Sequence, residues 1–201
     1  MTIAERALTA KGAATRERIV DAAAGLFYEH GVTETGNDDI RREARVSGSQ
    51  LNHYFANREQ LVKAVLDRRA AAAADPSRVP GIGRPATLDA WQDWADEYVD
   101  EWVDRLGGCR VGSIAGETLK SAFSMQEDVA AAFERWRSVL ETGLYVLREN
   151  GALKPAADVE RLSLVLLASL EGGLLLTQAM RDPAPLRAAL DAAVATIRRE
   201  A

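Results

Sequence analysis

The 201-residue sequence predicts an all-α fold of about nine helices. Alanine and leucine dominate the chain, and no β-branched run alternates between apolar and polar residues as a half-buried strand does. Apolar residues instead recur every three or four positions, which places them on one face of a helix. A chain of this length buries about two-thirds of its unfolded surface, so it needs no disulfide or metal to hold its core.

The first helix is expected over residues 16–30, with Thr15 as its N-cap and residues 1–14 as a flexible N-terminal arm. Gly31 ends it, because glycine is the residue that most readily takes the left-handed conformation after a helix. Its apolar face is predicted from residues at helical spacing: Ile19, Ala22, Ala23, Leu26 and Phe27.

Three helix starts follow, each with a capping residue and a partner three positions later. These starts are Thr35-Gly-Asn-Asp38, Ser47-Gly-Ser-Gln50 and Asn57-Arg-Glu-Gln60. They predict helices over 36–44, 48–54 and 57–73. Two short helices joined by a tight turn, inside a three-helix unit, are typical of a helix-turn-helix.

Residues 75–87 contain three prolines and two glycines and separate this unit from the rest of the chain. Helices are expected beyond the break over 88–106, 112–122, 126–149, 157–181 and 184–200. The acidic residues of the first lie opposite its aromatic residues, so we expect them to face solvent and not a cationic ligand.

The net charge of −5 is unevenly distributed. Residues 1–70 carry 11 Lys+Arg and 10 Asp+Glu (+1), and the remainder carries 14 and 20 (−6), which favours different partners at the two ends. The single cysteine suits the cytoplasm, and polar residues interrupt the apolar run 162–180, so no membrane helix is expected. Two histidines and one cysteine far apart offer no metal spacing, and no cofactor is predicted.

The second short helix carries the residues that suit DNA. Spacing leaves Gln50, Asn52 and His53 pointing outward, with Arg45 in the turn. Glutamine and asparagine can bond the edge of adenine in two places, and Thr35 and Ser47 can donate to phosphate. Short capped helices also occur in many all-α proteins, so spacing alone leaves a purely structural role open.

Residues 16–66 resemble the N-terminal domain of the tetracycline-repressor (TetR) family of transcriptional regulators. The resemblance rests on the Ile19–Phe27 pattern and on Gly31, Thr35, Ile40, Ala44, Val46-Ser47, Leu51-Asn-His53-Tyr54-Phe55 and Arg58-Glu59-x-Leu61. It implies a helix-turn-helix DNA-binding domain over 15–60 and a helical effector-binding and dimerisation domain over 61–201. It also implies a set of DNA-contacting residues: Thr35, Arg45, Ser47, Gly48, Ser49, Gln50, Asn52, His53, Tyr54 and Arg58.

Three positions depart from the family pattern. Arg41 stands where a small alanine is usual, Arg45 replaces the turn glycine, and Asn52 replaces a tyrosine that commonly touches the DNA backbone. We hypothesise that Arg45 adds a phosphate contact and that Asn52 is short enough to reach a base.

The segment from Gly108 to Glu117 is similar to a G-C-x-x-G-S-x-A-x-E segment in one branch of the family, which includes repressors of flavonoid and multidrug-response genes. In that branch the segment lies near the pocket. Aromatic walls suit a flat, apolar small-molecule effector, although an aromatic stripe at helical spacing is also ordinary core. The predicted pocket consists of Trp91, Trp94, Tyr98, Trp102, Cys109, Phe123 and Trp136.

The last two helices are expected to form a homodimer. The helix over 157–181 is apolar over more than half its circumference, so it has more than one partner, with burial in a monomer as the alternative. A twofold axis would set two recognition helices about 34–36 Å apart on a palindromic double-stranded operator. The predicted interface consists of Leu164, Leu167, Leu174, Leu175, Leu186, Leu190 and Ile197.

These patterns favour a ligand-responsive homodimeric repressor in the cytoplasm. A helical carrier or interaction protein with a non-functional helix-turn-helix, or a regulator that answers to a protein partner, remain alternatives. No motif places a nucleophile beside a base, so an enzyme is not predicted.

Overall fold

The computed structural model describes residues 9–103, 108–120 and 125–201, without the side chains of residues 102 and 103. These ranges form nine α-helices and one short 3-10 turn (Pro76–Arg78), and their only β-pairing is an isolated bridge between Pro80 and Arg84. The prediction of an all-α fold of about nine helices is confirmed.

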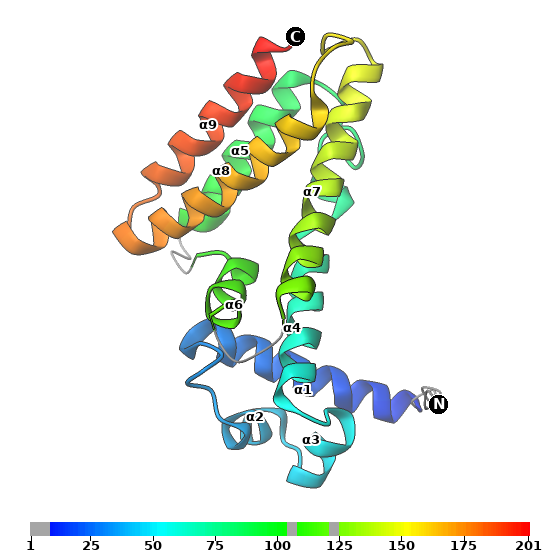
Figure 1. Cartoon of the computed structure of the whole chain (residues 1–201), viewed down its shortest axis with the longest axis vertical. Helices are drawn as coiled ribbons and strands as arrows, with labels where there is room; N and C mark the ends of the chain where they lie inside the picture. The colour runs from blue at the N-terminus through cyan, green and yellow to red at the C-terminus, as the bar shows by residue number, and fades with distance from the viewer. Residues whose placement is uncertain (1–8, 104–107, 121–124) are drawn as a thin grey trace.

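The molecule has a head and a body, which lie at the lower and upper ends of Figure 1. The head contains α1 (Ala10–His30), α2 (Asn37–Ala44) and α3 (Gly48–Tyr54). Helix α4 (Arg58–Ala73) leaves the head and packs along α7. The remaining helices are α5 (Leu88–Val103), α6 (Arg110–Thr118), α7 (Gln126–Glu149), α8 (Val159–Met180) and α9 (Ala184–Arg199).

The start of α1 differs from the prediction. The N-cap is Thr9, whose side chain accepts a hydrogen bond from the Gly12 N–H at 3.2 Å. Thr15 lies inside the helix and its hydroxyl donates to the Lys11 carbonyl at 3.0 Å. The prediction of Thr15 as N-cap, with a flexible segment reaching to residue 14, is wrong, because alanine-rich sequence extends the helix back to the earlier threonine.

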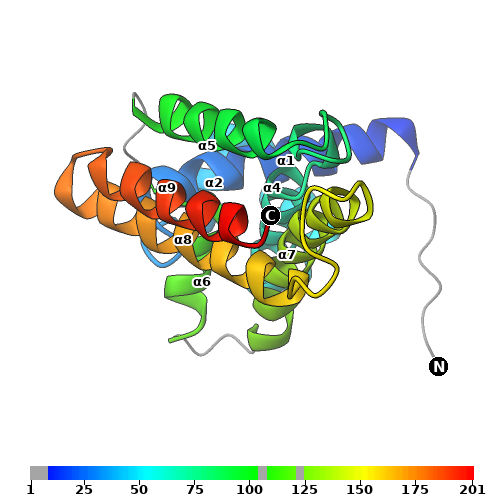
Figure 2. The same cartoon turned by 90° about the horizontal axis from the view of Figure 1, so that it is seen from above.

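The body is layered, with α9 between α5 and α8 (Figure 2). Its acidic face on α5, expected in solvent, instead pairs with arginines of α9. Arg187 forms ion pairs with Asp96 and, at 3.6 Å, with Asp100, and Arg198 pairs with Asp89 at 2.9 Å. The carboxylates therefore hold two helices of one chain together and offer no cation site.

Helix α8 is the one described helix whose length and composition would suit a membrane span, with a mean hydropathy of 1.6 over the most apolar window. It packs against α7 and α9, and its Leu162, Leu166 and Leu170 are at most 1% exposed. These contacts make α8 a core helix of the body and not a membrane span.

Candidate nucleic-acid interface

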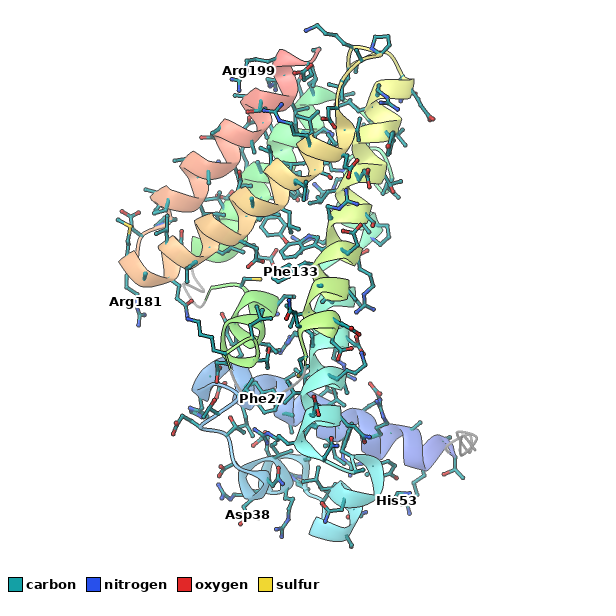
Figure 3. The ribbon with its side chains drawn as sticks, viewed as in Figure 1. Phe27, Asp38, His53, Phe133, Arg181 and Arg199 are labelled. Carbon is teal, nitrogen blue, oxygen red and sulfur yellow. The ribbon has the colours of Figure 1, made fainter. Side chains whose placement is uncertain are left out.

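Helix α3 presents a polar surface at the far end of the head. Leu51 is buried and anchors the helix, while Ser49, Asn52 and His53 are exposed. Figure 3 shows His53 at the end of the molecule opposite Arg199. The side chains that would meet DNA are therefore available to a partner, as the spacing predicts.

The capping box at the start of α3 is confirmed. Ser47 Oγ accepts from the Gln50 N–H at 3.2 Å, and the Ser47 N–H donates to Gln50 Oε1 at 2.9 Å. Gln50 is exposed, but this bond occupies its amide oxygen. The two-point contact with adenine needs both the oxygen and the nitrogen of the amide. While the cap is intact, Gln50 therefore offers only its NH₂ group.

Thr35 faces the protein interior. Its hydroxyl donates to the Gly31 carbonyl at 2.7 Å and it is only 5% exposed. The N-cap of α2 is Gly36, whose N–H donates to Asp39 at 3.1 Å. The predicted Thr35–Asp38 capping box, and a phosphate contact from the Thr35 hydroxyl, are therefore wrong.

Arg58 is also a structural residue. One of its terminal nitrogens donates to the carbonyls of Val32 and Thr35 at 2.8 and 2.6 Å, and the other donates to Asn37 Oδ1 at 3.3 Å. Its guanidinium lies over the Phe27 ring, and burial lowers the pKa of Arg58. This side chain ties α4 to the α1–α2 loop, so its predicted role as a DNA contact is wrong.

The turn between α2 and α3 is a Schellman motif with Arg45 at its left-handed position. Arg45 has φ 54° and ψ 51°. The Val46 N–H donates to the Arg41 carbonyl at 3.0 Å, and the Arg45 N–H donates to the Arg42 carbonyl at 3.3 Å. Glycine is usual there because a Cβ is strained at positive φ. The exposed Arg45 side chain forms no ion pair with any described carboxylate, and no structural reason for an arginine here is visible.

This strain gives the first testable prediction. Arg45→Gly should raise Tm by about 2–4 °C, because relieving a left-handed residue contributes about 1 kcal/mol. If Arg45 contacts phosphate, the same change should lower the slope of log K against log[salt] by about 0.9. Thermal unfolding and DNA titration over a salt series measure the two effects.

Arg181 provides the matched control, because it also has positive φ (56°) but follows α8 at the other end of the molecule. Arg181→Gly should stabilise the chain similarly and leave the salt slope unchanged. An unchanged slope for Arg45→Gly would contradict the phosphate contact.

Arg41 is a head residue that the predicted site omits. Its guanidinium carbon lies 3.7 Å from the point where a Cβ on Gly48 would stand, at the start of α3. It pairs with Asp38 at 2.6 Å, and its Nε is buried without a partner among the described residues. Its departure from the family pattern was the signal in the sequence that could have included it.

The aromatic residues of α5 form core and not a ligand cavity. Trp91 and Trp94 are 0% and 3% exposed, and their rings meet edge to face at 5.5 Å. A side chain without accessible surface borders no space wide enough for water. The prediction that these two tryptophans line the effector pocket is therefore wrong. Phe123 and the side chain of Trp102 lie outside the described residues.

Two cavities meet at Cys109. The smaller, about 80 Å³, is lined by Tyr98 and Trp136 with Arg69 and Arg110. The larger, about 420 Å³, lies between α6 and α8. Burial, followed by the nearby carboxylate of Glu171, raises the pKa of Cys109 well above its usual range, so it remains a thiol and is a poor nucleophile.

Helix α6 connects the larger cavity to the head. Glu117 lines the cavity, and its carboxylate accepts hydrogen bonds from the N–H groups of Val32 and Thr33, both at 2.9 Å. Those two residues belong to the α1–α2 loop that Arg58 also holds. A shift of α6 would therefore act directly on the loop that positions the helix-turn-helix.

Known proteins share both parts of this architecture. A family model described as "Bacterial regulatory proteins, tetR family" matches residues 19–65. A second, described as "Transcriptional regulator LmrA/YxaF-like, C-terminal domain", matches residues 86–192, more than half of the chain. The chain belongs to the TetR family. It is therefore a transcriptional regulator and not an enzyme.

Relatives of this TetR-family regulator match it over most of its length. The HTH-type transcriptional regulator LmrA of Bacillus subtilis is 28% identical over 180 residues, which cover 86% of this chain and 90% of that protein. An HTH-type transcriptional repressor of Streptomyces coelicolor is 30% identical over 87 residues, 43% of this chain and 42% of that protein. The crystal structure of a TetR regulator from Chloroflexus aurantiacus is 27% identical, with a TM-score of 0.78, and the match covers 96% and 98% of the two chains.

The predicted dimer residues of this TetR-family chain separate into two groups. Leu174, Leu186, Leu190 and Ile197 are at most 1% exposed and pack inside one subunit, so their assignment to a dimer surface is wrong. Leu164 and Leu175 are 50% and 64% exposed, and Leu167 is half-buried. We call the exposed apolar face of this helix the α8 strip: Leu164, Ala168, Gly172, Leu175 and Leu176.

Proposed function

We propose that this chain is a homodimeric repressor that binds double-stranded DNA through α3 and releases it when a small molecule binds between α6 and α8. The observation that carries the proposal is α3 itself, a capped seven-residue helix held by Leu51 with its polar face exposed at one end of the molecule. A helix placed in this way fits the major groove. Repression follows the name of the Streptomyces coelicolor relative.

The DNA-contacting set is Arg45, Ser47, Gly48, Ser49, Gln50, Asn52, His53 and Tyr54. In this proposal Arg45 and His53 hold the phosphate backbone, and Asn52 reaches a base. Tyr54 is half-buried, and its ring meets that of His53 edge to face at 5.0 Å, which orients the histidine. The structural roles of Thr35 and Arg58 remove them from the set.

A second copy is the proposed partner of the α8 strip. An exposed face with three leucines loses apolar surface to water only if something covers it. Closed twofold dimers are the commonest assembly of soluble chains, and a twofold axis would make the operator palindromic. The DNA-binding head would end in the first turn of α4, near residue 60, with the effector-binding and dimerisation body beyond it.

Release would proceed through α6. A ligand in the larger cavity touches the helix whose Glu117 holds the α1–α2 loop. It shifts the chain toward the conformation that it binds more tightly, and only by that difference in affinity. The match to the LmrA/YxaF-like model supports placing the Gly108–Glu117 segment in the branch with flavonoid and multidrug-response repressors, acting in the cytoplasm.

The two histidines test the DNA-binding proposal. DNA is selected from a random duplex library with the wild-type chain, and binding of the selected duplex is then measured for His53→Ala and His30→Ala. We expect a palindromic site and a loss of about 3- to 10-fold for His53→Ala, the effect of one hydrogen bond. His30 is exposed at the end of α1, so His30→Ala should bind like wild type. No enrichment, or equal losses for both variants, would refute the proposal.

A further inference from the structure

The cavity between α6 and α8 is acidic. Its nine lining residues include two carboxylates, Glu117 and Glu171, and no lysine, arginine or histidine. A volume of about 420 Å³ lies within the usual range for small-molecule sites. With two carboxylates in the wall and no counter-charge there, the cavity disfavours an anion.

The two carboxylates differ in how they are satisfied. Glu117 uses both oxygens on the α1–α2 loop, as described above. Glu171 Oε1 is buried and has no hydrogen-bond partner among the described residues. Burial raises the pKa of Glu171, and the hydrogen bond with the Cys109 thiol lowers it to a lesser degree. A buried carboxylate oxygen without a donor is unfavourable, and a donor brought by a ligand would satisfy it.

Glycines leave room for a ligand beside this carboxylate. A Cβ built on Gly116 of α6 or on Gly172 of α8 would meet no atom within 4 Å. Gly112 lets Glu171 lie close to α6, because its Cβ would stand only 2.4 Å from Glu171 Oε2. Leu175 adds an apolar wall. The space therefore combines one unsatisfied acceptor with a largely apolar surround.

We propose that this cavity binds an organic amine in its ammonium form, with an N–H donating to Glu171 Oε1 and an apolar body lying along the Gly116–Gly172 walls. The inference rests on the proposed function for its biological role, since it names the class of effector. A hydrogen bond between an ammonium and a carboxylate is about twice as strong as one between neutral groups. An alcohol of the same shape should therefore bind more weakly.

Two probes with the same apolar body test the charge. 4-Phenylbutylamine and 4-phenyl-1-butanol are titrated calorimetrically into the full-length chain without DNA. We expect the amine to bind at least about 10-fold more tightly than the alcohol. Glu171→Gln, which keeps the size of the side chain, should weaken the amine to the level of the alcohol and leave the alcohol unchanged.

Two glycine variants test the place. Gly116→Leu fills the cavity and should abolish binding of both probes. Gly25→Leu is the matched control, because Gly25 also has open space at its Cβ position and lies in α1, away from the cavity.

Equal affinities of the two probes, an unchanged amine affinity in Glu171→Gln, or undiminished binding by Gly116→Leu would each overturn the inference. Operator binding without amine binding refutes this inference alone. Amine binding without any operator refutes the proposed function alone.

Discussion

Arg58→Ala is expected to destabilise the chain by about 3 kcal/mol and to lower Tm by about 6–12 °C. The reason is that one guanidinium serves three acceptors, the carbonyls of Val32 and Thr35 and the side chain of Asn37. Hydrogen bonds from a charged donor each contribute about 1.5–3 kcal/mol, and water replaces part of that loss at a half-buried site. Thermal unfolding monitored by circular dichroism measures the change.

Two comparisons separate this structural role from a DNA contact. Arg58→Lys keeps the charge but has no planar fork to reach all three acceptors, so it should lose about half as much stability. The fraction of Arg58→Ala that remains folded should bind DNA with the salt slope of the wild type. A slope lower by about 0.9 with unchanged Tm would show that Arg58 contacts phosphate instead.

Leu175→Glu is expected to weaken self-association by about 100-fold or more. Leu175 is 64% exposed in the middle of the α8 strip, and in a twofold dimer the substitution occurs twice. Burying a leucine contributes about 1.5–3 kcal/mol, and the introduced carboxylate adds the penalty of losing its water. Sedimentation equilibrium over a range of protein concentrations measures the association constant.

Leu119→Glu is the matched control for this surface. Leu119 is 52% exposed at the end of α6 and lies outside the α8 strip. It should leave the association constant unchanged, while Leu175→Glu should also weaken binding to a palindromic duplex because the two heads are no longer joined. Equal association constants for wild type and Leu175→Glu would remove the strip as the dimer surface.

Local sequence predicted the helices because their limits are local. The Ser47 and Asn57 caps and the breaks at Gly31 and Asp182-Pro183 act within a few residues, and α3 and α7 begin and end where the pattern places them. The error at the start of α1 has the same origin: Thr9 and Thr15 both fit a cap, and only the alanines between them favour the earlier one.

The direction of side chains was less predictable because it depends on distant partners. Arg58 reaches carbonyls more than twenty residues away, and Glu117 reaches Val32 and Thr33 from across the fold. In α8, Leu174 and Leu175 are neighbours of the same type, yet one is 1% and the other 64% exposed. A helix that is apolar nearly all round gives no sign of which leucines its own chain covers.

Gly172 and Leu175 belong both to the wall of the α6–α8 cavity and to the α8 strip. If a second copy covers the strip, occupancy of the cavity and pairing of subunits share part of one surface and become thermodynamically linked. Ligand affinity would then vary with protein concentration, and a saturating ligand would shift the monomer–dimer midpoint by the same factor. The amount of regulator in a cell would thus help to set its sensitivity to the signal.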